Sequence, residues 1–355
     1  MTTPFDDQLL FIFDRMGYHP TCRAMKNNYG KHLGRSKKEM IEKIVQITAS
    51  DAAHQQFLLD CGTNCTHLGT RQLELFTLKD QIRKRTLNTF FNSLTLSSNQ
   101  TLKDSYPFPI TDQSLLSKLP KNNVEIMEKS SVVFGNKTYQ FAVFSTVVEH
   151  EVQIDGSRFL NQDGVDLVTQ QDAKFFYVTS EYRQLFHILY WCESDESAIL
   201  SIDRNGISVH QSRDQLYLVR NYIDQRAIGA LGKPLNVFDA IEPLYNDVDG
   251  RITKLGHVTS DGNPVRLNLS RGQTCLKQDK YHEAGEDSGY VHAKFAVGKR
   301  WSLGNVDEHS TIEVDLAGKA AMLDNAQPLS DFEVAKCSKL SDLNFAIQNV
   351  LPHAC

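Results

Sequence analysis

The sequence has no apolar run long enough to cross a bilayer, which takes roughly 20 residues. The most apolar stretch near its start, Leu9 to Phe13, is far shorter. Two acidic residues, Asp6 and Asp7, precede this stretch where a secretion signal carries basic residues. We therefore expect no membrane association and no export by the ordinary route. This predicts a cytoplasmic protein, or a nuclear one in a eukaryote.

The sequence also lacks the glycine-rich motifs that bind phosphates and dinucleotides. It has no Gly-x-x-x-x-Gly-Lys loop, no dinucleotide glycine fingerprint and no nucleophile elbow around a serine. These absences exclude the common NTPase pattern. They favour a binding protein without a cofactor over an enzyme.

Cysteine is sparse and scattered along the chain. The seven cysteines are Cys22, Cys61, Cys65, Cys192, Cys275, Cys337 and Cys355. An odd number without a secretion signal argues for reduced thiols in a cytosol rather than for a disulfide framework.

What the chain does have is an ordinary globular composition and a charge asymmetry. Its 355 residues are 41% hydrophobic and 23% charged, enough for a sizeable core and for two or three domains. Residues 1–90 contain 13 Lys or Arg against 9 Asp or Glu, a balance of +4, whereas the remainder has 25 against 34, a balance of −9. This asymmetry indicates two parts with different partners, unless it is the fluctuation of a few charges that small segments show.

The pattern of apolar residues predicts an α+β protein whose residues 1–94 form a small basic helical domain. Helical spacing runs through this part, and Ser36 with Glu39 forms a capping box at the start of one helix. A longer helix is expected from about Thr70 to Leu94.

The rest of the chain predicts a linker and a larger body. Residues 95–122 are rich in polar residues and contain three prolines, which is typical of a linker. Residues 123–355 contain β-branched and aromatic segments separated by turn-forming pairs, with interspersed and C-terminal helices. We therefore expect a mainly antiparallel β body, within which residues 207–250 offer a further boundary.

Basic residues cluster around the helix that Ser36 caps, and again near residue 84. Helix N-termini with nearby Lys or Arg are good phosphate binders, so we predict nucleic-acid contact here. The candidate nucleic-acid-binding residues are Lys26, Lys31, Arg35, Lys37, Lys38, Lys43, Arg83, Lys84 and Arg85. Glu39 and Glu42 dilute the charge, so an ordinary solvated helix face is the alternative interpretation.

The run from Gly34 to Ile44 is similar to the second helix of small helix–turn–helix DNA-binding modules such as SAP domains. This resemblance covers about a dozen residues. It implies a DNA-binding role for the segment.

A second candidate site lies at His292 and Lys294. The run from Tyr290 to Asn305 resembles the histidine–lysine half-site of phospholipase D-type phosphodiesterases, in which the histidine attacks phosphorus and the lysine binds a phosphate oxygen. The family's aspartate, five residues after the lysine, is Lys299 here, and the chain has no second half-site. The resemblance therefore implies a phosphodiesterase that would need a dimer. The alternative is a strand with alternating side chains.

Two further patterns could hold a metal ion. Cys61, Cys65 and His67 place three soft ligands within seven residues, although not at the usual knuckle spacing. His19 and Cys22 could complete such a zinc site from an earlier helix. On balance this spacing predicts no metal.

Acidic residues gather near predicted turns and strands. They are Glu193, Asp195, Glu196, Asp203, Asp247, Asp249, Glu313 and Asp315. A Mg²⁺-dependent nuclease needs two or three carboxylates and a lysine on a sheet, which Glu313, Asp315 and Lys319 only approximate. Acidic residues at turns are usually solvated.

The sequence as a whole favours a nucleic-acid-associated binding protein. Its basic helical domain would contact phosphates, while the acidic β body docks a partner protein or forms a homodimer. Two alternatives stay open. One is a phosphodiesterase or nuclease that uses His292 and Lys294 or a carboxylate-bound metal, and the other is a pure protein-interaction component of a larger assembly.

Overall fold

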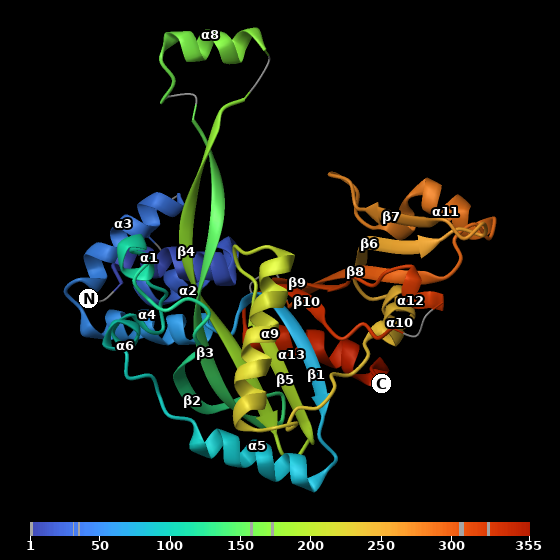
Figure 1. The fold of residues 1–355 in the computed structure, drawn as a ribbon, viewed down its shortest axis with the longest axis horizontal. Coiled ribbons are helices and arrows are strands. Elements are labelled where there is room, and N and C mark those ends of the chain that lie inside the picture. Colours follow the sequence, from blue (N-terminus) through green and yellow to red (C-terminus); the bar gives the residue numbers. More distant parts are fainter. Residues whose placement is uncertain are drawn as a thin grey trace.

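A computed structural model of the chain describes residues 3–30, 32–34, 36–156, 159–171, 174–304, 309–324 and 327–355. The chain is an α+β protein, as predicted, in which N-terminal helices are followed by an antiparallel sheet with further helices (Figure 1). No helix in the described part of the chain is long and apolar enough to span a membrane.

The helices begin with a group of four at the N-terminus. These are α1 (Phe5–Met16), α2 (Tyr18–Tyr29), α3 (Lys37–Thr48) and α4 (Ala52–Cys65). The helices that follow are α5 (Gln81–Ser93), α6 (Gln100–Ser105), α7 (Gln113–Leu116), α8 (Gln162–Gln170), α9 (Val209–Arg226), α10 (Ile241–Asn246), α11 (Lys280–Asp287), α12 (Ala321–Asp324) and α13 (Leu340–Val350). The predicted capping box is half formed, because the Ser36 hydroxyl accepts a hydrogen bond from the Glu39 backbone N–H.

Ten described strands form one antiparallel sheet. They are β1 (Gly69–Thr77), β2 (Glu125–Phe134), β3 (Lys137–Asp155), β4 (Phe176–Cys192), β5 (Ser197–Asp203), β6 (Arg251–Val258), β7 (Pro264–Asn268), β8 (Lys294–Leu303), β9 (Ser310–Leu316) and β10 (Phe332–Cys337). Their order across the sheet is β2-β3-β4-β5-β1-β10-β9-β8-β6-β7. The first five and the last five strands in this order therefore meet where β1 pairs with β10.

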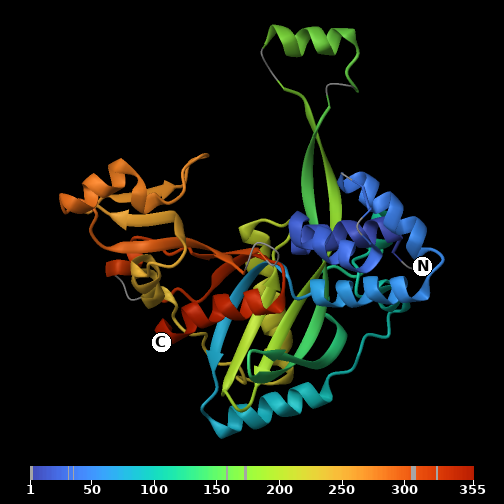
Figure 2. The same ribbon diagram turned by 180° about the vertical axis from the view of Figure 1, so that it is seen from behind.

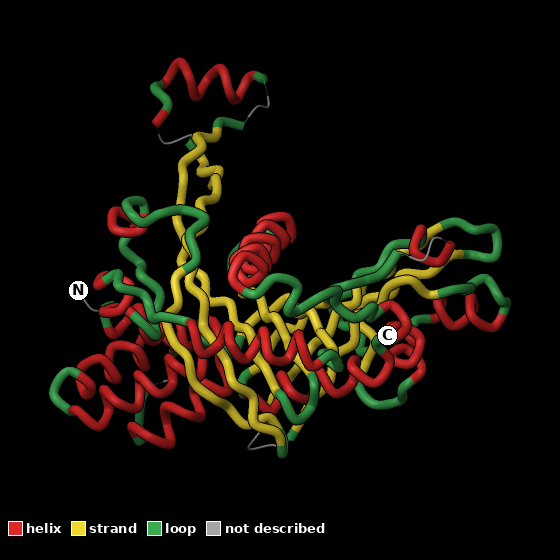
Figure 3. The backbone as a smooth tube through the Cα atoms, turned by 60° about the horizontal axis from the view of Figure 1, so that its bottom comes forward, coloured by secondary structure: helices red, strands yellow, loops and turns green. Residues whose placement is uncertain are grey.

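Helices cover both faces of this sheet. On one face α5 and α9 bury Phe90, Val219 and Ile223 against strand residues such as Leu200. On the other face the N-terminal helices and α13 form a larger core (Figures 2 and 3). Coverage of both faces explains why the central strands carry buried side chains at successive positions.

The prediction of a helix from Thr70 to Leu94 is wrong for the first half of this segment. Residues 69–77 form strand β1, which pairs with β5 on one side and β10 on the other, and the helix begins only at Gln81. The polar side chains of Arg71 and Glu74 concealed the strand in the sequence. Both are buried, so their places depend on partners far along the chain.

The predicted linker is an ordered part of the fold. Residues 95–122 contain α6 and α7, and the Phe108 ring is buried against Phe11 of α1 at 5.9 Å between ring centroids. Because β1 belongs to residues 1–94 but lies in the middle of the sheet, removing this part would remove a central strand. Whether residues 1–94 and 123–355 fold independently stays a prediction.

Candidate functional site

The most prominent feature of the molecule is a long β-ribbon that projects from the sheet, with α8 at its far end (Figures 1 and 2). Strands β3 and β4 pair from Gln140 opposite Trp191 to Asp155 opposite Phe176. Strand β2 leaves β3 at Ser145, and β5 reaches β4 only as far as Ile188. We call residues 149–182, where the ribbon has only these two strands, the arm.

The arm carries exposed apolar side chains opposite acidic and amide side chains on the paired strand. Val178 lies opposite Gln153 and Phe176 opposite Asp155 in the ribbon. Val178 is 56% exposed and Phe176 is 46% exposed. Near the end of the arm, the Phe159 ring is 61% exposed and meets Tyr177 edge-on at 5.3 Å.

The arm is strongly acidic. Residues 149–182 contain seven Asp or Glu and two Lys or Arg, a net charge of −5. At its base, Glu149 accepts hydrogen bonds from the Lys121 ammonium at 2.6 Å and the Tyr182 hydroxyl at 3.2 Å. An arm of this charge would be repelled by the phosphates of a nucleic acid.

A groove of about 800 Å³ lies between α1 and α3 in the N-terminal helices, and we call it the head groove. Its apolar lining comes from Leu10, Ile41 and Val45, and Lys37 and Lys38 also line it. The remaining lining residues are Asp6, Glu42 and Gln46. The head groove therefore combines an apolar surface with two ammonium groups and two carboxylates, of which Lys38 and Glu42 pair at 4.0 Å.

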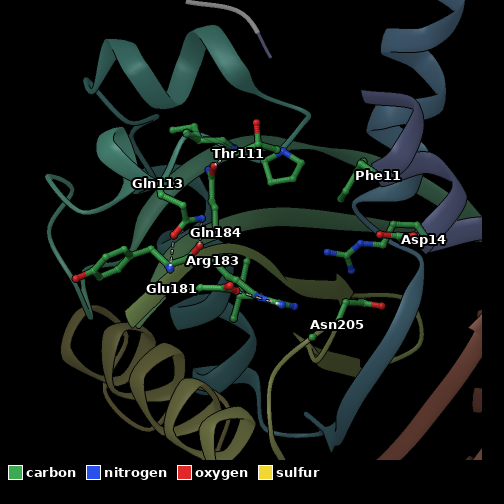
Figure 4. Close-up of a pocket in the computed structure, with 14 residues that line it drawn as sticks. Phe11, Asp14, Thr111, Gln113, Glu181, Arg183, Gln184 and Asn205 are labelled. Carbon is green, nitrogen blue, oxygen red and sulfur yellow. Dashed lines mark hydrogen bonds and ion pairs between the residues drawn. The ribbon is translucent and has the colours of Figure 1, made fainter. Parts of the chain in front are cut away.

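A second cavity of about 550 Å³ lies between α1, the segment around Thr111 and strand β4 (Figure 4). Two glutamine side chains build its wall. The Gln113 amide both donates to and accepts from the Tyr182 backbone, at 3.0 and 2.7 Å. The Gln184 amide accepts from the Ile110 N–H and donates to the Ser145 hydroxyl. These hydrogen bonds fix the wall and leave the amides little capacity for a ligand.

Arg183 is the most available cation of this cavity. Within the part of the chain that the structure describes, its one ion pair is with Glu181 at 3.9 Å (Figure 4). The guanidinium lies over Gly206, where a Cβ atom would come within 1.5 Å of Nη1. The backbone of Gly206 also has a φ of +73°, so its conformation favours glycine, whereas the Arg183 side chain above it can move.

Behind this cavity lies a fully buried charge cluster. The Arg15 guanidinium donates to both oxygens of Asp203, at 2.7 and 2.5 Å. The same carboxylate accepts from the backbone N–H groups of Phe186 and Asn205, each at 3.1 Å. Arg71 lies in the same region, buried at 0% exposure, with its guanidinium donating to the Phe186 carbonyl.

Burial and charge act against each other in this cluster. Burial lowers the pKa of Arg71 to about 10, and the neighbouring Asp203 opposes that shift. Burial alone would raise the pKa of Asp203, but Arg15 and Arg71 outweigh it and hold that pKa well below its usual range. The cluster is enclosed and its carboxylate is already paired with Arg15, so we assign it a structural role.

The candidate nucleic-acid-binding residues fall into two separate places. Lys26, Lys38 and Lys43 are exposed on α2 and α3, whereas Lys37 is half-buried and its ammonium lies over the Phe13 ring. The second group lies on α5, which is at the bottom of Figure 1, apart from α2 and α3 at the left.

In that second group, Arg83 and Arg85 are exposed, but Lys84 is buried and pairs with Glu196 at 2.5 Å. Lys84 is therefore held inside the protein and cannot reach a phosphate. Lys31 and Arg35 lie outside the described residues.

The phosphodiesterase candidates lie next to each other but are not arranged as a catalytic pair. His292 is exposed and precedes strand β8, which begins at Lys294. The Lys294 ammonium pairs with Glu242 at 3.2 Å and with Glu286 at 3.9 Å. Two carboxylates therefore compete with any phosphate for this lysine. Lys299, in place of the family's aspartate, is buried and pairs with Asp247 at 2.7 Å.

The zinc candidates are also used by the fold. Burial raises the pKa of Cys61 to about 11 and that of Cys65 further, so both thiols hold their protons at neutral pH. His67 is buried, with Nδ1 at 2.7 Å from the Tyr190 hydroxyl. Across the described residues, no group of three or more His, Cys, Asp or Glu side chains is placed to hold a metal ion.

The acidic residues considered for magnesium are distributed among separate ion pairs. Asp195 pairs with Lys137. Asp315 pairs with Lys254 at 2.5 Å, and Glu313 accepts from Arg300 at 2.8 Å. Each of these three carboxylates has a cationic partner on a neighbouring strand or turn, which is typical of structural pairs.

No protein-family model matches the chain, and no curated protein matches it. The arm is the feature that sequence reasoning missed. Its signal is the period-two alternation from Glu151 to Asp155, in which Val152 and Ile154 alternate with polar residues, and which predicts a ribbon with two different faces.

Proposed function

We propose that the protein is an assembly-forming interaction protein that docks through its arm. The single observation that carries this proposal is a two-stranded ribbon that extends beyond the sheet with exposed Phe159, Phe176 and Val178. A two-stranded ribbon is marginally stable in water on its own, and exposed apolar groups of this size mark interaction surfaces. Burial of each such side chain contributes about 1.5–3 kcal/mol.

The charge of the arm defines the chemistry of its partner. A net charge of −5 favours a basic surface with an apolar depression. The head groove of a second copy of the chain presents the apolar depression, with Lys37 and Lys38 beside Leu10 and Ile41, and Asp6 and Glu42 also in its lining. We therefore propose that the arm of one copy docks into the head groove of another. This agrees with the homodimer or partner docking that the sequence favours.

Substitution of the apolar arm residues tests this proposal. The double variant Phe176→Ser/Val178→Ser removes exposed apolar side chains of the arm and leaves the buried core unchanged, so we expect self-association to weaken at least about tenfold, the effect of 1.4 kcal/mol. The measurement is sedimentation velocity of the intact protein over a range of concentrations and salt. Salt should weaken association because it screens the acidic arm from the lysines.

The matched control is Ile228→Ser/Val248→Ser, which replaces two apolar residues that are 88% and 90% exposed elsewhere on the surface. We expect this variant to associate like the unsubstituted protein. A monomer at all concentrations, or equal association of both double variants, would contradict docking through the arm.

Nucleic-acid binding by the N-terminal helices is the second candidate function. It is favoured by the exposed ammonium groups of Lys26, Lys38 and Lys43 on adjacent helices. Lys43 also donates a hydrogen bond to the His32 carbonyl at 3.2 Å, which orders that loop. Lys26 and Lys43 do not line the head groove, so they separate this function from arm docking.

Charge reversal of these two lysines tests the second function. In Lys26→Glu/Lys43→Glu, we expect the slope of log Kobs against log salt to fall by about 1.8 for duplex DNA, because each phosphate contact contributes about 0.9. The measurement is fluorescence anisotropy of a labelled duplex with the intact protein. The control variant is Lys103→Glu/Lys319→Glu, which reverses two exposed lysines outside the N-terminal helices. Equal salt slopes in both variants would rule out this contact.

A further inference from the structure

A cavity of about 330 Å³ lies beside the first turns of α9, over the strands where the two halves of the sheet meet (Figure 1). We call it the sheet cavity. Strands β1, β6, β9 and β10 contribute to its lining together with α9. None of its described lining residues belongs to the arm, the head groove or the cavity beside Arg183. Ligand pockets in proteins have volumes of about 300–1,000 Å³, so the sheet cavity suits a small molecule.

A row of residues that crosses the sheet forms one wall of the sheet cavity. Lying opposite one another on β1, β10, β9, β8 and β6 are Gln72, Glu333, Asp315, Gly298 and Lys254. Residues directly opposite each other point to the same face of a sheet. A Cβ atom on Gly298 would come within 2.8 Å of the Lys254 side chain, so glycine leaves room for Lys254 to cross β8 and reach Asp315 at 2.5 Å. The polar side chains of four strands therefore converge on one space.

Two carboxylates of this row are close neighbours, and each has its own cation. Glu333 lies directly opposite Asp315, a placement in which like charges destabilise a sheet. The Arg204 guanidinium pairs with Glu333, and the Lys254 ammonium pairs with Asp315. These four groups therefore neutralise one another without a bound molecule.

A third carboxylate of the sheet cavity, Asp331, has no cation. The buried Gln72 amide donates a hydrogen bond to Asp331 at 2.7 Å and accepts one from the Ser212 hydroxyl at 2.7 Å, which fixes the amide. Within the part of the chain that the structure describes, Asp331 makes no ion pair. This carboxylate is therefore held in place on the cavity wall without a neutralising charge.

One cation of the sheet cavity also lacks a partner. Arg213 lies on α9, and among the described residues its guanidinium makes no ion pair and no hydrogen bond. Burial lowers the pKa of Arg204, and the carboxylates of Asp315 and Asp331 oppose this shift. Arg213 adds to the lowering, so both unpaired charges are close to Arg204. Asp331 and Arg213 thus line the same cavity without pairing with each other.

The two unpaired charges define the class of ligand. An anion such as phosphate would meet three carboxylates, and a simple cation would leave Arg213 without a partner. A metal ion is not favoured, because no group of three acidic, histidine or cysteine side chains in the described ranges is placed to hold one. A zwitterion satisfies both charges at once. The rest of the lining includes the apolar residues Val209, Leu329 and Phe332, which suit an apolar side chain.

We propose that the sheet cavity binds a free α-amino acid with an apolar side chain. The ammonium group of the amino acid pairs with Asp331, and its carboxylate pairs with Arg213. The bound molecule bridges α9 and the start of β10. This binding is independent of docking through the arm, because the two use different surfaces.

Calorimetric titration of the intact protein with leucine tests the site. Two analogues keep the side chain of leucine but lack one charge: isopentylamine lacks the carboxylate, and isocaproate lacks the ammonium group. We expect one leucine to bind per chain. Each analogue should bind at least about tenfold more weakly, the effect of one lost hydrogen bond between charged groups.

Two variants assign the charges of leucine to their partners. Asp331→Asn should weaken leucine binding at least about tenfold without weakening the binding of isocaproate. Arg213→Gln should weaken leucine binding to the same extent without weakening the binding of isopentylamine. The control is Arg226→Gln, which replaces another exposed arginine of α9 outside the cavity and should bind leucine like the unsubstituted protein.

Three results would overturn the proposal. The first is the absence of leucine binding by the unsubstituted protein at millimolar concentration. The second is equal affinity of the unsubstituted protein for leucine and for either analogue. The third is the same affinity for leucine in Arg213→Gln as in Arg226→Gln. If Asp331→Asn does not fold, as judged by circular dichroism, Arg213→Gln and the two analogues carry the test.

Discussion

Replacement of Asp203 by alanine is expected to destabilise the protein by about 3–5 kcal/mol, because it leaves buried cations without their counterion. The Asp203 carboxylate is 0% exposed and accepts hydrogen bonds from Arg15 and from two backbone N–H groups. Arg71 lies in the same cluster, and its Nη2 already has no hydrogen-bond partner among the described residues. Without Asp203, two guanidinium groups would face each other in the core.

Urea denaturation at pH 7 measures this loss. The control is Asp249→Ala, which removes an exposed carboxylate and should change stability by no more than about 0.5 kcal/mol. A loss below about 1 kcal/mol in Asp203→Ala would show that water reaches the cluster and replaces the carboxylate. Either way, the slope of the transition should stay the same, because the surface exposed on unfolding does not change.

The second large effect is a loss of stability as the pH falls from about 6.5 to about 4. Burial lowers the pKa of His187 to about 4, Arg71 and Arg15 act in the same direction, and Asp203 opposes them. The ring is fully paired in its neutral form: Nδ1 accepts from the Asp203 N–H, and Nε2 lies 2.9 Å from the Thr146 hydroxyl, which donates to Gln215. Protonation of Nδ1 would remove the acceptor of the Asp203 N–H.

Stability falls as the pH falls because the pKa of His187 is lower in the folded than in the unfolded protein. The unfolded histidine takes up a proton near pH 6.5 and the folded one only near pH 4, so the unfolded state gains protons first. Stability is therefore fully present above pH 6.5 and falls by roughly 3 kcal/mol by pH 4 for this residue alone. His67, whose pKa burial lowers to about 3, adds to the loss in the same direction.

Urea midpoints measured between pH 7 and pH 4 test this prediction. His187→Gln should have a shallower pH dependence than the unsubstituted protein, whereas the exposed control His210→Ala should follow it. A midpoint that does not change between pH 6.5 and pH 4.5 would contradict the buried neutral state of His187.

Local signals in the sequence were sufficient for much of this fold. The cap at Ser36 and the C-terminal helix α13 each depend on residues a few positions apart, and each is found where the sequence predicts it. The sequence did not predict strand β1, because the stability of this strand depends on distant partners. Glu74, which reads as a helix residue, is buried in β1 because Arg220 of α9 pairs with it.

The candidate sites were harder to predict than the fold. Asp331 and Arg213 are 118 positions apart and share a cavity only because α9 lies beside the start of β10. In the arm, β3 ends at the turn-forming pair Asp155–Gly156, but its partner strand β4 begins only at Phe176. Turn chemistry locates the end of a strand, but the sequence does not specify how far away its partner begins.

The position of β1 also has a consequence for how the chain folds. Two blocks of strands, β2–β5 and β6–β9, can form from neighbouring segments as they emerge from the ribosome. Strand β1 is synthesised before both, yet it joins them by pairing with β10, near the other end of the chain. The contact of greatest sequence separation in the sheet is therefore the one that unites it, and such contacts form slowly. One edge of β1 can pair with β5 early, but the nascent chain must keep its other edge from wrong partners until β10 has been made.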